Sequence, residues 1–542
     1  MNFYRLTVCL FLSVTFATSL VASAQEFPRW SKAELTFTSD SLYDNPLYAV
    51  ADFYLTLRSP TGLEQEVDGF WDGENQWKVR FKLEEIGNWT YETTCSDTTN
   101  VGLHAQQGSL TISENEDSLA IYQKGRLIHP AGTYHLTYSD GTPFFWTACT
   151  AWNGALRSTE EEWDTYLQHR VDNGYNTIQF VTTQWRGGPA NDEGLTAYTK
   201  DGPITLNVDF FDRMDEKVDR INAYGLVAAP VILWGLPFGE GRHLSPGYDL
   251  PYDDAYLLAR YIKARYGGNH VVWMLGGDAQ YYGEMESRWK YLGGSVFQRK
   301  HNLVALHPHG RSWIGALYDD EAWLDIIGYQ SSHSNQQRTV DWITKGPVAQ
   351  EWDEIAPRPL INLEPNYEEI HFTITDRDVR NASYWSLFTA PVSGITYGAN
   401  GLWPWLREGE LIINHEKTPG ISDWETSMKF PGSLQIGYLA EFMRQYAWWN
   451  LRPAPDLLMK QPGHEQYNKF ISVAQSLDNE LILVYLPAQQ EAKLRVGTRA
   501  YEGRWFNPST NNYVTAEITQ QSGVLNATPP DDSDWVLALA AK

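Results

Sequence analysis

The stretch Val271-Val-Trp-Met-Leu-Gly-Gly-Asp278 indicates the fold, because it is a short apolar run that ends directly in an acidic residue. Apolar and polar side chains do not alternate along it, and this is typical of a strand buried on both faces of a parallel sheet. Folds built on such sheets place ligands and chemistry just past the carboxyl ends of the strands. Asp278 is therefore predicted to lie at the functional edge of a buried sheet.

Further apolar runs of the same kind surround this stretch, with amphipathic helices predicted between them. Together with residues 270–276, the predicted strands are residues 143–148, 176–181, 226–233, 303–306, 325–329, 358–363 and 394–397. The segment Ser158-Thr-Glu-Glu161 has the pattern of a helix-opening capping box, and Phe211, Met214, Val218 and Ile221 repeat at helical spacing. Eight such units over about 300 residues predict a (β/α)₈ TIM barrel, with a doubly wound sheet as the less favoured alternative.

The sequences on both sides of this region have a different periodicity. Trp77, Val79 and Phe81 alternate with polar residues, as in a strand with one face in a core and the other in water. We predict an immunoglobulin-like β-sandwich at residues 25–117, the catalytic barrel at residues 118–455 and a second β-sandwich at residues 456–542.

The first 24 residues have the pattern of a signal peptide. Arg5 precedes an apolar run, and Ala22-Ser-Ala24 supplies the small residues of a cleavage site. No later segment is long and apolar enough to predict a membrane span, so we expect an exported protein, periplasmic or extracellular. Cleavage would leave Cys95 and Cys149 in different predicted domains, which argues against a disulfide framework.

Composition and charge narrow the classes of ligand. A formal net charge of −25 makes nucleic-acid binding improbable, although a local group of basic residues could still bind an anionic polysaccharide. Aromatic residues form 14% of the chain, including 23 Trp. Flat rings stack on sugar faces, so some of them are expected to line a glycan site, while others fill large aromatic cores.

Two carboxylates lie at the predicted ends of opposite barrel strands. Asp278 follows the fourth strand, and Glu364 follows Pro359-Leu-Ile-Asn-Leu363 of the seventh. A glycosidic bond held between them would meet one carboxyl as proton donor and the other as nucleophile or stabilising anion. A single strand-end acid is more often structural, but the pair on these two strands favours catalysis.

Aromatic, amide and imidazole side chains follow the other strands and are candidate sugar contacts. These substrate-binding candidates are Trp152, Asn153, Gln184, Trp185, Trp234, His307, Gln330, His333, Tyr367, Tyr397 and Trp403. We expect no cofactor and no metal, because His301, His307 and His309 straddle a strand without an obvious carboxylate partner. Serine-hydrolase, zinc-protease and phosphate-loop motifs are absent.

Several stretches resemble the apiosidase-like glycoside hydrolases, a family with a sandwich before the barrel and a collagen-binding-like sandwich after it. They are Pro143-Phe-Phe-Trp-Thr-Ala-Cys-Thr-Ala-Trp152, Gly174-Tyr-Asn-Thr-Ile-Gln-Phe180, Trp273-Met-Leu-Gly-Gly-Asp278, Arg358-Pro-Leu-Ile-Asn-Leu-Glu-Pro365 and Tyr397-Gly-Ala-Asn-Gly-Leu-Trp403. The resemblance implies a retaining mechanism with Asp278 as acid/base and Glu364 as nucleophile. It also implies a plant or algal cell-wall polysaccharide as substrate, with the side chains of pectin as the leading candidate.

The chain departs from the family at two positions. The family commonly has Gly-Asp-Thr-Ala-Trp after the first strand, whereas this chain has Ala148-Cys-Thr-Ala-Trp152. The resemblance therefore implies a lost sugar-hydroxyl contact at Cys149 and does not extend to apiose specificity. Gly277 stands where two-glutamate barrel hydrolases usually have Asn, which implies a different contact to the 2-hydroxyl.

Two other functions remain open from the sequence. One is a non-catalytic glycan-binding protein at the cell surface, and the other is a polysaccharide lyase with a Tyr or His base. Liberation of reducing ends distinguishes the hydrolase from the first, and an ultraviolet-absorbing double bond in the product identifies the second. The sequence indicates neither the oligomeric state nor exo or endo action.

Overall fold

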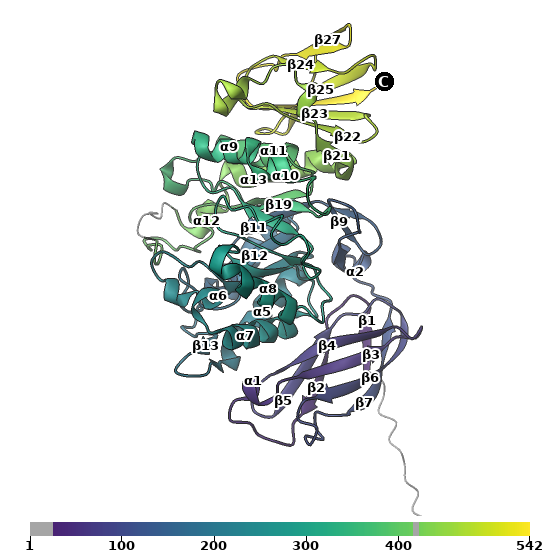
Figure 1. Cartoon of the computed structure of the whole chain (residues 1–542), viewed down its shortest axis with the longest axis vertical. Coiled ribbons are helices and arrows are strands. Elements are labelled where there is room, and N and C mark those ends of the chain that lie inside the picture. Colours follow the sequence, from purple (N-terminus) through teal and green to yellow (C-terminus); the bar gives the residue numbers. More distant parts are fainter. Residues whose placement is uncertain (1–24, 416–421) are drawn as a thin grey trace, which may run out of the picture.

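Three sheet-rich parts follow one another along the longest axis of the molecule (Figure 1). The computed structural model describes residues 25–415 and 422–542, so the predicted signal peptide at residues 1–24 lies outside the described residues. The N-terminal part lies at one end, a strand–helix barrel occupies the middle, and the C-terminal part lies at the other end (Figure 1). No described helix is long and apolar enough to cross a membrane.

The central part is an eight-stranded parallel sheet that nearly closes on itself. Its strands, in the order in which they pair, are β17 (Val304–Ala305), β16 (Trp273–Gly277), β15 (Val227–Trp234), β12 (Thr177–Val181), β11 (Trp146–Thr150), β20 (Gly394–Tyr397), β19 (Leu360–Glu364) and β18 (Ile327–Gln330). A parallel bridge between Ala305 and Ile326 joins the two outer strands. All the predicted strands are present, and the sheet confirms a TIM-like barrel rather than an open doubly wound sheet.

One predicted strand combines two elements. Residues 143–148 divide into β10 (Pro143–Phe144), which pairs with β9 (Leu136–Tyr138), and the start of the barrel strand β11. The strand β8 (Leu127–Ile128) completes this small antiparallel sheet beside the barrel. The uninterrupted apolar run from Phe144 to Trp146 concealed the break, because hydropathy does not mark where one strand leaves a sheet.

Helices cover the barrel between its strands. The longer ones are α4 (Glu160–Asp172), α5 (Val208–Ala223), α7 (Tyr252–Tyr266), α8 (Glu286–Val296), α9 (Gln337–Lys345), α10 (Pro347–Glu351), α11 (Asp376–Phe388) and α13 (Pro431–Arg444). The predicted stripe on α5 is buried. The capping box of α4 begins one residue later than predicted, at Thr159 with Glu162. Ser158 instead accepts a hydrogen bond from the buried Lys217 Nζ at 3.0 Å.

Shorter elements fill the connections. They are α1 (Pro46–Ala49), α2 (Ala120–Gln123), α3 (Gly154–Arg157), α6 (Pro246–Asp249) and α12 (Trp424–Ser427), with the two-residue strands β13 (Tyr198–Thr199) and β14 (Thr205–Leu206). Short 3₁₀ turns lie at residues 242–244, 283–285, 370–372, 448–450, 455–457, 462–464 and 467–469.

The N-terminal part is a seven-stranded sheet folded over its own core. Its order is β1 (Gln25–Pro28), β7 (Gln107–Ser113), β6 (Gly87–Cys95), β3 (Phe53–Arg58), β4 (Glu64–Trp71), β5 (Gln76–Phe81) and β2 (Ala33–Thr38). Residues 64–68 of β4 pair with β3, and residues 69–71 pair with β5. Buried side chains of β2, β3, β5 and β6 share one core. The immunoglobulin-like assignment stays a prediction.

The C-terminal part has two sheets around a common core. The six-stranded sheet consists of β21 (Leu451–Pro453), β22 (Ser472–Ser476), β23 (Leu481–Leu486), β29 (Trp535–Ala541), β25 (Tyr501–Asn507) and β26 (Asn512–Thr515). The three-stranded sheet consists of β24 (Ala492–Arg495), β28 (Val524–Ala527) and β27 (Ile518–Gln521). Ile482 and Trp505 of the first sheet pack in one cluster with Leu494 and Leu525 of the second.

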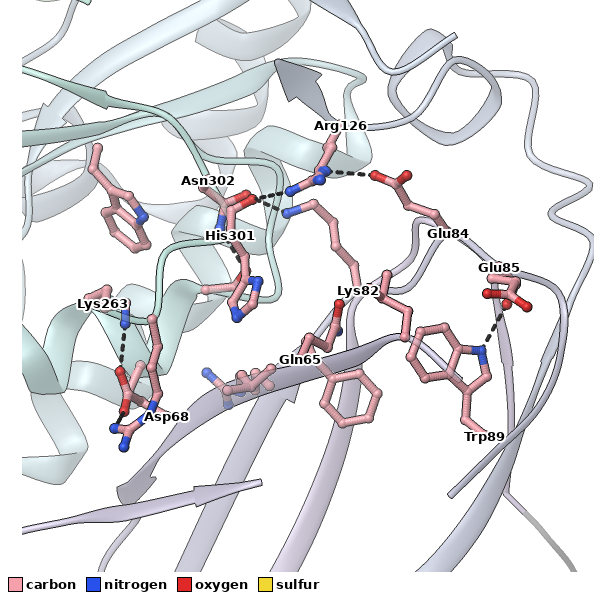
Figure 2. A pocket seen from close by; sticks show the side chains of 18 residues that line it. Gln65, Asp68, Lys82, Glu84, Glu85, Trp89, Arg126, Lys263, His301 and Asn302 are labelled. Carbon is pink, nitrogen blue, oxygen red and sulfur yellow. Dashed lines mark hydrogen bonds and ion pairs between the residues drawn. The ribbon is translucent and has the colours of Figure 1, made fainter. Parts of the chain in front are cut away.

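Buried ion pairs hold the N-terminal part against the barrel. Arg265 of α7 is fully buried and pairs with Asp72 at 2.8 Å and with Asp215 at 2.7 Å. Lys263 and Arg299 both pair with Asp68 of β4, at 2.5 and 2.8 Å (Figure 2 shows Lys263 and Asp68). Several charged pairs of this kind restrict relative motion of the two parts.

A bidentate ion pair joins the barrel to the C-terminal part, and its loss is expected to be costly. Arg380 of α11 donates to both carboxylate oxygens of Asp534 at 2.7 and 2.8 Å, and the two side chains are only 4% and 2% exposed. Asp534→Ala would leave the guanidinium buried without this partner, so we expect a loss of about 3–5 kcal/mol in local unfolding free energy. Hydrogen exchange of β23 and β29 measures it. The exposed control Glu517→Ala should change it by less than about 0.5 kcal/mol, and equal protection in both variants would contradict the prediction.

Candidate active site

Asp278 and Glu364 lie at the carboxyl ends of two barrel strands, as the sequence predicts. Glu364 is the last residue of β19 and is 5% exposed, and Asp278 follows β16 and is half-buried. The backbone of Asp278 is left-handed, with φ of 49°, a conformation that Asp tolerates better than most residues. The turn therefore aims the carboxyl group into the barrel mouth.

The two glycines before Asp278 are required by packing. A Cβ atom at Gly277 would lie 2.5 Å from the ring of Trp234, and one at Gly276 would lie 2.7 Å from Trp289. No side chain fits at either position without displacing an indole ring. An Asn side chain at position 277 would therefore meet the ring of Trp234.

One amide connects the two carboxylates. Gln330, the last residue of β18, donates from Nε2 to Asp278 Oδ1 at 2.7 Å and to Glu364 Oε2 at 2.6 Å. The two acceptor oxygens can therefore lie no more than 5.3 Å apart, the sum of these distances. Gln330 was predicted as a substrate contact. In the structure its amide donates to both carboxylates and so fixes their positions relative to each other.

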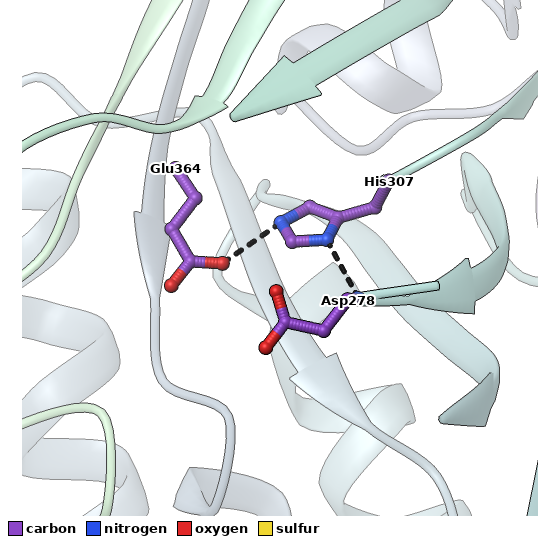
Figure 3. Close-up of side chains that lie close together, drawn as sticks. All are labelled: Asp278, His307 and Glu364. Atoms are coloured by element: carbon purple, nitrogen blue, oxygen red, sulfur yellow. Dashed lines mark hydrogen bonds and ion pairs between the residues drawn. The ribbon is translucent and has the colours of Figure 1, made fainter. Parts of the chain in front are cut away.

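Two histidines hold the Glu364 carboxylate. His307 Nε2 lies 3.0 Å from Oε2, and His333 Nε2 lies 3.0 Å from Oε1 (Figure 3 shows Asp278, His307 and Glu364). The backbone N–H of Asp278 donates to His307 Nδ1 at 3.1 Å, so the ring proton of His307 is on Nε2, facing Glu364. His333 Nδ1 lies 2.8 Å from the carbonyl oxygen of Pro365. Its ring is therefore held between the Pro365 carbonyl and the Glu364 carboxylate.

These contacts separate the pKa values of the two acids. Burial alone would raise the pKa of Glu364, but the imidazoles of His307 and His333, which contact both of its oxygens, outweigh burial and hold that pKa well below its usual range. Burial and the adjacent charge of Glu364 raise the pKa of Asp278 to about 6. One carboxyl is thus kept ionised beside another that can carry a proton.

The carboxylates open into a cavity of about 360 Å³ with aromatic walls. Trp185 and Trp234 are tilted against each other with ring centroids 4.2 Å apart, and Trp152 lies edge-on to Trp234 at 5.7 Å. Trp152 Nε1 donates to the Tyr367 hydroxyl at 2.8 Å, which fixes both rings. Rigid rings beside hydrogen-bonding groups suit a ligand with both apolar and hydroxyl-bearing faces.

Most predicted contact residues line this cavity, and four do not. Those that line it are Trp152, Trp185, Trp234, Gln330, His333, Tyr367 and Trp403. Asn153 bonds the Gly187 and Pro404 carbonyls, Gln184 bonds Ala197 and Tyr198, and the Tyr397 hydroxyl donates to Glu368. His307 is fully buried behind Glu364. These four predictions of direct contact are corrected, because neighbouring protein groups occupy the polar atoms.

Other cavity residues were not predicted as contacts. They are Arg186, Leu236, Phe238, His309, Gly310, Ser332, Ile370, His371 and His415. Arg186 and His309 follow predicted residues closely and could have been included on that basis. Phe238, His371 and His415 lie further along the loops after their strands, where no periodic pattern shows which way a side chain faces.

Cys149 lies away from the cavity. Its side chain is fully buried, and its Sγ atom is 3.6 Å from Nη1 of Arg170 on α4. The inference of a lost sugar contact at this position is therefore wrong, since a side chain there faces a helix rather than the barrel mouth. Both cysteines of the described residues, Cys95 and Cys149, are free.

Asp278, His307 and Glu364 together have the donors of a cation site. One ligand atom from each lies within 4.8 Å of the other two. Glu364 is the carboxylate partner of His307 that the sequence does not show, because the two residues belong to different strands and meet only in the folded barrel. His301 lies elsewhere, with its Nε2 2.6 Å from the carbonyl oxygen of Glu66.

Comparisons with known proteins agree with this architecture. The model of the family described as "Apiosidase-like, catalytic domain" matches residues 130–450, a putative collagen-binding domain of a collagenase matches residues 453–540, and a domain of unknown function matches residues 26–96. No curated protein matches the chain.

Solved structures show the same fold at low sequence identity. A putative glycoside hydrolase from Bacteroides vulgatus has 16% identity and a TM-score of 0.72, covering 96% of this chain and all (100%) of its own. A glycoside hydrolase of family 5 from the same organism has 22% identity and a TM-score of 0.66, covering 77% of this chain and 94% of its own. Another glycoside hydrolase has 23% identity and a TM-score of 0.66, and the match covers 77% of this chain and 97% of that protein.

Proposed function

The chain belongs to the apiosidase-like glycoside hydrolases, and we propose that it cleaves glycosidic bonds with retention, with Asp278 as acid/base and Glu364 as nucleophile. The observation that carries this proposal is the shared amide of Gln330, 2.7 Å from one carboxylate and 2.6 Å from the other. Retaining enzymes hold their two carboxyl groups about 5–5.5 Å apart, whereas inverting enzymes need room for a water molecule. The close pair supports the retaining mechanism.

The first step uses the two acids in opposite states. Glu364, held ionised by His307 and His333, attacks the anomeric carbon, while Asp278 gives its proton to the leaving oxygen. The glycosidic C–O bond breaks and an ester to Glu364 forms. Preorganised donors around Glu364 keep its carboxylate in place for this attack.

The second step reverses the role of Asp278. Esterification removes the negative charge of Glu364, which is one cause of the raised pKa of Asp278. Asp278 then acts more readily as a base and takes a proton from water, whose oxygen attacks the anomeric carbon and frees Glu364. The same pair thus supplies acid in one step and base in the next.

We propose a plant or algal cell-wall polysaccharide as substrate, and the side chains of pectin are the leading candidate. The aromatic walls of the cavity and its imidazole and amide groups support a carbohydrate ligand. A screen of pectic and algal polysaccharides for new reducing ends, with Glu364→Gln as the inactive control, tests this function. Binding without cleavage would indicate the non-catalytic alternative, and unsaturated products would indicate a lyase.

We also propose that the signal peptide predicted at residues 1–24 directs export of the protein and is then cleaved off. An apolar run followed by Ala22-Ser-Ala24 supports it. N-terminal sequencing of the mature protein should begin at Gln25, and an intact Met1 would contradict export.

The fall of kcat/KM at alkaline pH should be set by deprotonation of Asp278. The first step needs protonated Asp278, whose pKa is raised to about 6 by burial and by Glu364. Above that pH the protonated fraction falls, so we expect kcat/KM to fall about tenfold per pH unit. Initial rates from pH 4 to pH 9 measure it. A kcat/KM that stays constant to pH 8 would contradict this assignment.

Hydrolysis is expected to be independent of a divalent cation. Gln330 points an N–H group at Glu364 Oε2, His307 Nε2 lies 3.0 Å from the same oxygen, and His333 faces Oε1, so these groups would oppose a cation at either oxygen. Prolonged dialysis against a chelator should leave the rate within about twofold, and added Mn²⁺ or Zn²⁺ should not raise it. A loss that metal ions restore would place a cation in this cluster.

A further inference from the structure

A second cavity, of about 260 Å³, lies between the N-terminal part and the barrel (Figure 2). Its walls include Lys82 and Trp89 of the N-terminal part, Arg126 directly before β8, and His301 and Asn302 of the barrel. His301 and Asn302 precede β17, so this interdomain cavity lies at the amino ends of the barrel strands. The carboxylate pair lies at the opposite ends.

Lys82 is the unusual cation in this cavity. Its Nζ atom donates to the carbonyl oxygen of Asn269 at 2.8 Å and to Asn302 Oδ1 at 2.6 Å, and both acceptors are neutral. Among the described residues, no carboxylate lies within ion-pair distance of this atom. An ammonium group has three N–H donors, so one more donor remains for a ligand.

The other cations of the interdomain cavity already have acidic partners. Arg80 pairs with Glu34 and Asp215, while Lys263 and Arg299 pair with Asp68. Arg126 donates from Nε to Glu84 at 2.6 Å and from Nη1 to the carbonyl oxygen of His301 at 2.9 Å. The charge of Lys82 is therefore the one that lacks a carboxylate partner, and Arg126, whose guanidinium has five N–H donors, can still donate to an anion bound beside it.

The surroundings of Lys82 disfavour its charge while the cavity holds no anion. Burial lowers the pKa of Lys82 to about 7; the positive charge of Arg126 acts in the same direction, and Glu84 opposes it. His270 and His301 also face this ammonium, and burial lowers the pKa of each of them, to about 3 and about 4. A carboxylate bound at Lys82 would favour the charged form and so raise its pKa.

We propose that the interdomain cavity binds a small sugar acid, whose carboxylate pairs with Lys82 and Arg126. The cavity is close in size to the smallest ligand pockets, which begin at about 300 Å³. Gln65 offers an amide for ring hydroxyls, and Trp89 contributes an aromatic wall. Lys82 and Arg126 come from different segments, so the ligand would also join the N-terminal part to the barrel.

Calorimetric titration of the full chain with D-galacturonate tests the proposal, with D-galactose, which has a hydroxymethyl group in place of the carboxylate, as the control. We expect galacturonate at pH 6 to bind at least tenfold more tightly than galactose. Lys82→Gln, which keeps an N–H donor but removes the charge, should weaken galacturonate binding at least tenfold. Trp403→Ala, in the catalytic cavity, should leave it unchanged, which separates the two sites and makes the test independent of the proposed hydrolysis.

The pH dependence provides a test that needs no variant. Because Lys82 is expected to bind the carboxylate in its protonated form and its pKa without ligand is about 7, binding at pH 8.5 should be about thirtyfold weaker than well below pH 7. Binding of galacturonate should also be coupled to uptake of a proton. The measured binding enthalpy should therefore change with the ionisation enthalpy of the buffer. Equal binding of galactose, no binding at millimolar galacturonate, or binding that Trp403→Ala removes and Lys82→Gln does not would overturn the proposal.

Discussion

Glu364→Gln is expected to lower kcat by at least about 10⁴-fold, the scale on which loss of a catalytic nucleophile acts. An amide cannot form the ester intermediate, and it replaces one acceptor oxygen with an N–H group. That group would face either the N–H donor of Gln330 or the ring nitrogen of His333. Steady-state rates on the best polysaccharide found in the screen measure the effect.

A matched control is available four residues away. Glu368 is 2% exposed, accepts hydrogen bonds from the Tyr397 hydroxyl and the Gly432 N–H, and does not line the catalytic cavity. Burial raises its pKa to about 7, so a neutral amide suits its site. Glu368→Gln should keep activity within about threefold. If Glu364→Gln were as active as this control, Glu364 would not be the nucleophile.

Asp278→Asn is expected to be the second most damaging change, and its effect should depend on the leaving group. Proton transfer by a positioned acid contributes about 10²–10⁴-fold, so kcat/KM on a natural polysaccharide should fall by that factor. An aryl glycoside of the same sugar needs little protonation of its leaving oxygen. Its first step should slow much less, and the ester to Glu364 should accumulate because the base for the second step is missing.

Three readouts check this variant. The burst of aryl alcohol measures the first step, the steady-state rate measures the second, and the pH profile should lose its limb near pH 6. Added azide, a nucleophile that needs no base, should restore turnover. Equal slowing of both substrates without a burst would indicate that Asp278 has another role.

The strands were predictable because each satisfies a local rule. A parallel strand covered by helices is apolar on both faces, so runs such as residues 270–276 stand out, and Gly277 marks the end of β16. The acids of the candidate site followed from the same rule, since a barrel brings its strand ends together. The one-residue error at Thr159 arose because Ser158 has equal capping propensity but bonds Lys217 instead.

The remaining parts of the site depend on contacts between distant segments. His307 and Glu364 belong to different strands, so the sequence could not show that the histidine lies behind this carboxylate. Asn153 and Gln184 have amide side chains and follow barrel strands, which suits sugar contacts. Backbone carbonyls of neighbouring loops nevertheless accept the hydrogen bonds of these amides. Strand position alone does not reveal such a competition for polar atoms.

The central claim is that two carboxyl groups joined by Gln330 act as a retaining pair. Proton NMR at the start of hydrolysis tests it most directly, by recording the anomeric configuration of the new reducing end before mutarotation. The account predicts the same configuration as in the bond that was cleaved. A first product of inverted configuration would contradict it.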